Sequence, residues 1–132
     1  MILSSVEKKS IIQYRVEKAL QTYKEACDNA QLGNWSLVAN RLYYSIFYLT
    51  LALNLLNGDY AKSHTGTYAL FNKRFILSGM LTKSESSLYR KLLSMRQTGD
   101  YDDLFDWDEE DIKPLIPEVK SLIDKLLTFI QL

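Results

Sequence analysis

The amino-acid sequence predicts an all-α protein, an antiparallel up-and-down four-helix bundle with one additional short helix. Apolar residues recur at steps of three and four along most of the 132-residue chain, which is the period of a helix that buries one face. Five isolated glycines separate these stretches, and no alternating strand pattern competes with them. The length suits one hydrophobic core, so residues 1–132 are expected to form a single helical domain.

The first two predicted helices are long and joined by a tight turn. Ser4 and Glu7 have the spacing of a capping box, and an apolar stripe then continues to Gly33. The stripe consists of Ile12, Val16, Ala19, Leu20, Tyr23, Ala26, Cys27 and Ala30. Asn34 is the expected cap of the second helix, which runs to a left-handed stop at Gly58.

A short third helix and a long fourth helix follow. Residues 59–65 are expected to form a loop, and residues 66–77 a short helix that ends near Gly79. Thr82 and Glu85 form a second capping box at the start of the fourth helix. The inward stripe of this helix, which Gly99 should close, consists of Leu88, Tyr89, Leu92, Leu93 and Arg96.

The last predicted helix covers residues 108–130. Asp108 and Asp111 suit the positive end of its dipole. Pro114 and Pro117 should kink or restart its first turns, because proline removes a backbone donor. Its apolar stripe consists of Leu115, Val119, Leu122, Ile123 and Leu126.

The charge of the chain is balanced in total and uneven in distribution. Sixteen basic residues offset sixteen acidic ones, but eight of the acidic residues lie within residues 100–111. The remainder therefore carries sixteen basic and eight acidic residues, a net charge of +8. A basic body keeps a phosphate-binding face open despite the neutral total.

Several features indicate a cytoplasmic protein without a membrane span. The single cysteine, Cys27, excludes an internal disulfide and fits a reducing compartment. Residues 1–5 lack the basic start of a secretory signal. The uncharged run 42–58 is shorter than the roughly 20 residues of a spanning helix and contains three tyrosines. We expect it to be a core helix.

One stripe of the second predicted helix carries Arg41, Tyr44, Ser45 and Tyr48, because residues three and four apart are neighbours on a helix. Two interpretations remain open. In the first, the tyrosine hydroxyls and Arg41 satisfy one another or nearby carboxylates where two helices cross. In the second, they form the wall of an anion or nucleotide pocket, in which Arg41 pairs with phosphate and the tyrosines stack on a base.

Arg96 and His64 are the other candidate site residues. Arg96 occupies an inward position of its helix, and Asp100 lies four residues further on, where it could pair with it. Without that pairing, Arg96 becomes a phosphate ligand at a helix end. His64 is the only histidine and lies in a polar segment ahead of a helix. It is interpreted either as a solvated or capping residue or as a catalytic group.

No metal site and no cofactor are predicted. A single histidine excludes a multi-histidine metal centre and the usual catalytic triads. The acidic stretch lacks the glycine of a calcium loop, because the sixth position counted from Asp100 is Phe105. The isolated glycines exclude a phosphate-cradling loop.

Three sequence blocks resemble the HEPN domain superfamily, specifically its short stand-alone prokaryotic members. The first is the run Ala-Asn-Arg-Leu-Tyr-Tyr-Ser-Ile-Phe at 39–47. The second is Ser63-His64 followed by Phe71 and Phe75, and the third is Arg-Gln-Thr-Gly-Asp-Tyr-Asp at 96–102. The resemblance implies a four-helix up-and-down bundle that pairs as a homodimer. It also implies a ribonuclease toxin, or a partner of a small nucleotidyltransferase encoded beside it.

Nuclease members of that superfamily share an arginine followed, after four to six positions, by a histidine. Arg96 matches the arginine, but Tyr101 stands where a histidine is expected and no histidine follows it. A phenol, with an ordinary pKa near 10, is a poor general base at neutral pH. Cleavage through Arg96, Asp100 and Tyr101 would therefore depart from the usual route, unless folding brings His64 beside Arg96.

Two functions follow from these residues. The first is RNA or nucleotide binding through Arg41, Tyr44 and His64, with metal-independent RNA cleavage by Arg96, Asp100 and Tyr101 as its enzymatic form. The second is a non-catalytic homodimeric interaction module, in which the arginine, tyrosine and aspartate side chains form a structural network.

Overall fold

The computed structural model describes residues 3–101 and 106–131, with residues 99–101 described in their backbone only. This part of the chain is helical and contains no strand, so the predicted all-α class is confirmed. The elements are α1 (Ser5–Gln31), α2 (Trp35–Leu56), α3 (His64–Phe71), the π-helical turn η1 (Asn72–Ile76), α4 (Lys83–Tyr101), α5 (Glu109–Ile112) and α6 (Leu115–Leu127).

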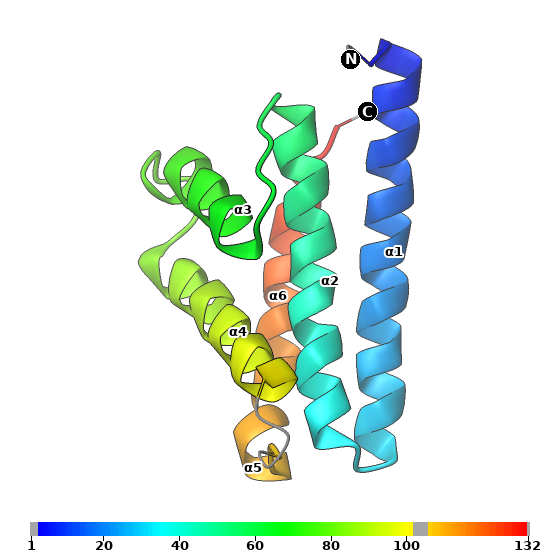
Figure 1. The fold of residues 1–132 in the computed structure, drawn as a ribbon, viewed down its shortest axis with the longest axis vertical. Coiled ribbons are helices and arrows are strands. Elements are labelled where there is room, and N and C mark those ends of the chain that lie inside the picture. The colour runs from blue at the N-terminus through cyan, green and yellow to red at the C-terminus, as the bar shows by residue number, and fades with distance from the viewer. Residues whose placement is uncertain (1–2, 102–105, 132) are drawn as a thin grey trace.

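Helix α2 is the innermost element, as its uncharged sequence predicts. It packs most extensively against α1 and also contacts α3, α4, α5 and α6. Eleven of its 22 residues are buried. Figure 1 shows α1 and α2 as antiparallel neighbours, with α6 behind α2 and with α3 and an inclined α4 on the side of α2 away from α1. The buried side chains of α2 therefore lie against other elements.

The predicted helix ends are confirmed where capping chemistry defines them. The Oγ of Ser4 accepts the N–H of Glu7 at 3.1 Å, and the Glu7 carboxylate accepts the N–H of Ser4 at 3.3 Å. In the second capping box, the Glu85 carboxylate accepts the N–H of Thr82 at 2.8 Å, and the Thr82 Oγ1 accepts the N–H of Glu85 at 3.1 Å. Gly58, with φ +78°, adopts the left-handed backbone that ends α2.

One local prediction is confirmed only in part, and three are wrong. Asn34 is the N-cap residue of α2, but its side chain makes no capping hydrogen bond and donates instead to the Oδ1 of Asn29 at 3.2 Å. Leu20 is 44% exposed, so it lies outside the buried stripe of α1. The short helix begins at His64, because Ser63 caps it by accepting the N–H of Gly66. Helix α4 continues past Gly99 to Tyr101.

The last predicted helix is divided in two. Helix α5 ends at Ile112, and Pro114 is the capping residue of α6. A restart at this position was expected, because a proline cannot donate the hydrogen bond that would join the two helices. Helix α6 then buries the predicted apolar stripe.

Candidate functional site

Four aromatic side chains of α2 form one cluster, which we call the aromatic face: Tyr43, Tyr44, Phe47 and Tyr48. Their spacing of three and four residues places them on one side of the helix. The Tyr43 and Tyr44 ring centroids are 5.0 Å apart, and Tyr44 lies 5.8 Å from Tyr48. Tyr43 is fully buried, whereas the other three rings are half-buried. The face is therefore partly open to solvent.

His64 lies on this aromatic face. Its ring stacks on Phe47, with centroids 4.3 Å apart and planes at 24°, and it meets Tyr44 edge-on at 5.9 Å. The Ser63 cap makes His64 the first residue of α3, so a helix start defines its backbone. His64 therefore lies in a helix and not in the predicted loop 59–65, and of the interpretations left open for it the solvated one is excluded, because the residue is half-buried against α2.

A short hydrogen bond joins His64 to the buried end of Tyr43. The Tyr43 Oη lies 2.6 Å from the His64 Nδ1. If the hydroxyl donates, the imidazole is neutral and its Nε2 carries the proton. In the imidazolium form, Nδ1 donates to the Tyr43 oxygen and Nε2 remains a donor. Tyr43 therefore orients the ring in both protonation states.

Arg41 borders the same cluster and is held from two sides. Its Cζ lies 5.4 Å from the centroid of the Tyr44 ring, in a cation–π arrangement. Its Nη1 is 3.3 Å from the Glu25 carboxylate of α1, while Nε and Nη2 donate to the Asn40 Oδ1 at 3.0 and 2.8 Å. The side chain is 25% exposed. Arg41 thus keeps part of its guanidinium at the surface.

The structure brings together the three residues predicted to bind a nucleotide. The Tyr44 ring contacts both Arg41 and His64. Ser45, predicted on the same stripe, is buried and donates to the backbone oxygen of Leu42 at 2.7 Å, so it does not contribute to this surface. Cation, ring and imidazole lie side by side, a combination that can contact phosphate and base together.

The predicted catalytic residues lie at the end of α4. Arg96 is half-buried, and its Nε is closed to solvent, which fits the inward position predicted for it. The backbones of Asp100 and Tyr101 belong to α4. Their side chains lie outside the described part of the structure, so the predicted pairing of Arg96 with Asp100 stays a prediction.

Sequence reasoning did not identify Tyr43 and Phe47 as contacts of His64. They precede it by 21 and 17 residues, and only the return of the chain along α2 brings them together. One signal was available in the sequence. A tyrosine on a helix that is buried on all sides needs a hydrogen-bond partner for its hydroxyl. A polar residue of a nearby loop can provide that partner.

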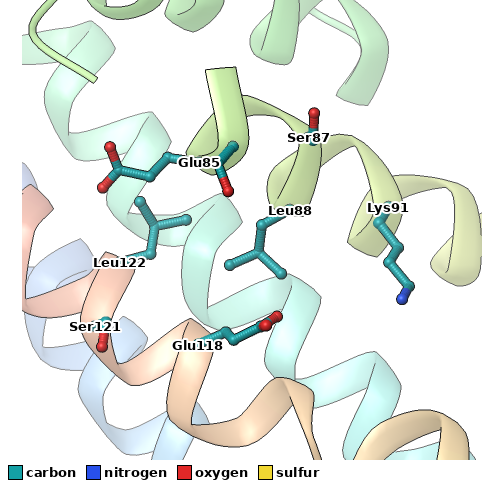
Figure 2. Close-up of a pocket in the computed structure, with 8 residues that line it drawn as sticks. Glu85, Ser87, Leu88, Lys91, Glu118, Ser121 and Leu122 are labelled. Carbon is teal, nitrogen blue, oxygen red and sulfur yellow. The ribbon is translucent and has the colours of Figure 1, made fainter. Parts of the chain in front are cut away.

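A separate groove lies between α4 and α6 (Figure 2). It has a volume of about 380 Å³, and its lining includes Glu85, Leu88, Lys91 and Glu118. Burial raises the pKa of Glu85, but hydrogen bonds from Lys125 and Thr82 outweigh that effect and leave the pKa below its ordinary value. Glu85 therefore serves to join α4 to α6. The groove holds neither a histidine nor a cysteine.

Within residues 3–101 and 106–131, no group of three or more histidine, cysteine, aspartate or glutamate side chains is arranged to hold a metal ion. No helix there has the length and apolar character needed to cross a membrane.

Comparisons with known proteins identify the family. The family model described as the HEPN domain matches residues 12–128. The chain is 32% identical over 128 residues to a "UPF0332 protein" of Thermotoga maritima, covering 95% of each chain. It is also 29% identical over 111 residues to a Methanocaldococcus jannaschii protein named "Putative toxin MJ0142", covering 83% of this chain and 75% of the relative. Because the family model spans nearly the whole of the sequence, this chain belongs to the HEPN domain family.

Proposed function

We propose that this HEPN protein binds RNA or a nucleotide at the cluster of Arg41, Tyr44 and His64. The observation that carries the proposal is the position of His64, which α3 holds against the aromatic face beside Tyr44 and Arg41. Aromatic rings stack on bases, and a guanidinium pairs with phosphate. The part of the chain outside residues 100–111 carries a net charge of +8, which favours binding of a polyanion in general.

The biological setting that we infer is a toxin-like component paired with a small nucleotidyltransferase. The name of the Methanocaldococcus relative supports the toxin role. We also infer a homodimer built on an up-and-down bundle of α1, α2, α4 and α6. Light scattering after gel filtration tests the dimer, with twice the 15.3 kDa chain mass as the expected result. Co-expression with the neighbouring gene product tests the partner.

Binding can be measured by fluorescence anisotropy with a labelled single-stranded RNA, with ATP and AMP as competitors. Tyr44→Ala is expected to weaken binding roughly tenfold or more, because it removes a stacking surface. Tyr14→Ala is the matched control, since Tyr14 is 63% exposed on α1. Equal affinities in native protein, Tyr44→Ala and His64→Ala would contradict the proposed site.

The enzymatic form of the proposal is metal-independent RNA cleavage, with Arg96 stabilising the developing phosphate charge. His64 would then supply the imidazole that the sequence after Arg96 lacks. Cleavage is compared in native protein, Arg96→Ala and His64→Ala with chelator present. Identical background rates in all three would exclude this enzymatic form and leave the binding function intact.

A second candidate function is a non-catalytic interaction module. The contacts of Arg41 favour it, because three of the five guanidinium N–H groups are used by Glu25 and Asn40 within the chain. In that case Arg96→Ala should lower the melting temperature strongly, since removing one member of an enclosed polar network leaves its partners unsatisfied. A near-neutral change in stability would count against the module.

A further inference from the structure

A cavity of about 210 Å³ lies at the end of the α1–α2 pair farthest from their connecting turn. Its walls include Ile11 and Arg15 of α1, Leu51 and Leu55 of α2, and Tyr60 of the α2–α3 connection. It shares no residue with the cluster of Arg41, Tyr44 and His64. Most of these walls are apolar, which is typical of small-molecule sites.

Arg15 is the cationic group of this cavity. Its Nη1 donates to the backbone oxygen of Leu51 at 3.4 Å, and no carboxylate of the described residues forms an ion pair with it. Burial lowers the pKa of Arg15, because the guanidinium has lost part of its hydration. Asp59 also lines the cavity, but its carboxylate is held by Arg74 at 2.8 and 3.3 Å. An anion in the cavity would therefore meet an uncompensated cation.

Asn54 provides a second, independent observation in the same cavity. The residue lines the cavity and is 3% exposed. Its Nδ2 donates to the backbone oxygen of Thr67 at 3.3 Å, which defines the amide orientation, since the reverse would oppose two oxygens. The Oδ1 is closed to solvent and accepts no hydrogen bond from the described residues. Buried acceptors are rarely left in this state.

We propose that this cavity binds a small apolar carboxylate that also carries an N–H donor. The carboxylate pairs with Arg15, the apolar body packs against Ile11, Leu51 and Leu55, and the donor satisfies the Asn54 Oδ1. Because no solvent reaches that oxygen in the structure, the donor must displace atoms that now surround it. Tyr60 lines the cavity and is 79% exposed, so its side chain can move without disturbing the core.

The test titrates the full chain with three related probes. Binding of each probe is measured from the changes in backbone amide chemical shifts in NMR spectra. N-acetyl-L-leucine has all three groups, N-acetyl-L-leucinamide lacks the charge, and 4-methylpentanoate lacks the N–H donor. Saturable shifts around residues 11–15 and 51–55 are expected for N-acetyl-L-leucine. The amide should bind at least tenfold more weakly, and 4-methylpentanoate should bind with intermediate affinity.

Variants identify the two polar contacts. Arg15→Gln should reduce the affinity for N-acetyl-L-leucine at least tenfold, whereas Arg90→Gln, an exposed arginine of α4, should not change it. Asn54→Leu should remove the advantage of N-acetyl-L-leucine over 4-methylpentanoate. The proposal is overturned if no probe gives saturable shifts at these residues, or if the acid and its amide bind equally to the native chain. The second comparison needs no variant, so a folding defect cannot obscure it.

Discussion

The Tyr43 hydroxyl lies 2.6 Å from the His64 Nδ1 and links the buried interior of α2 to the first residue of α3. Tyr43 is fully buried, so its ring cannot move without disturbing the core. The imidazole is consequently oriented by a rigid group, which is what a binding or proton-transferring histidine requires.

Tyr43→Phe should lower the free energy of unfolding by about 1 kcal/mol, because it removes one hydrogen bond and keeps the packing. The variant should also weaken RNA binding by less than His64→Ala does, since the ring of His64 is retained. Chemical denaturation and anisotropy provide the two measurements. Tyr14→Phe is the control at an exposed site. An unchanged midpoint of unfolding would show that the bond contributes little.

Glu25→Gln should strengthen RNA binding. Glu25 is a carboxylate that competes with phosphate for Arg41, and the pair is 3.3 Å apart with side chains 25% and 42% exposed. At that exposure the ion pair stabilises the fold by less than about 1 kcal/mol, so a small loss of stability is expected. Glu17→Gln, an exposed position of the same helix, is the control. Weaker binding in Glu25→Gln would favour a purely structural role for Arg41.

Gly66→Ala should not bring the stabilisation of about 1 kcal/mol that replacing a helical glycine usually brings. A Cβ at position 66 would lie 2.8 Å from the Ser63 Oγ, which must then leave its capping position. Loss of a cap costs about 1 kcal/mol, so the two effects nearly cancel.

The cancellation can be tested in a second background. In Ser63→Ala no hydroxyl remains, and adding Gly66→Ala should then stabilise by less than about 1 kcal/mol, because the new Cβ still lies 3.2 Å from the Ala61 Cβ. If Gly66→Ala has the same effect in both backgrounds, the Ser63 cap does not hold the start of α3.

Glu85→Gln should lower stability at neutral pH by about 1 kcal/mol, because the carboxylate accepts the N–H of Thr82 at the start of α4 and a hydrogen bond from Lys125 of α6, both at 2.8 Å. The pKa of Glu85 is lower in the folded state than its ordinary value. Its contribution is therefore present above the unfolded-state pKa and is lost as the pH falls through the folded-state pKa. Native and variant melting temperatures should converge in acid. A constant difference down to pH 2 would contradict this assignment.

The fold could be predicted from the sequence where short-range chemistry defines it. The capping boxes at Ser4 and Thr82 and the left-handed Gly58 involve residues within a few positions of one another. The error at Asn34 has a different origin. Asn34 occupies the N-cap position, but its Nδ2 donates to the Oδ1 of Asn29 in α1, and its side-chain oxygen accepts no capping N–H of α2.

The candidate site could be predicted only in part. Arg41 and Tyr44 share a helix stripe, so their proximity follows from helical periodicity. The position of His64 depends on how far the connection between α2 and α3 runs back alongside α2. No local sequence pattern encodes that distance. Glu25 was likewise not identified as the partner of Arg41, because the crossing of α1 and α2 determines which carboxylate lies opposite.

The connection between α2 and α3 acts as a spacer whose length selects the histidine's neighbours. Helix α2 ends at Leu56, nine residues beyond Phe47, which is about 14 Å along the helix axis. Residues 57–63 cover that distance on the way back, and seven residues can span at most about 25 Å. Removing one residue would shorten the reach by about 3.5 Å, roughly two-thirds of a helical turn. His64 would then lie opposite different residues of α2. Insertions and deletions in residues 57–63 should therefore affect the site more than single substitutions in the same segment.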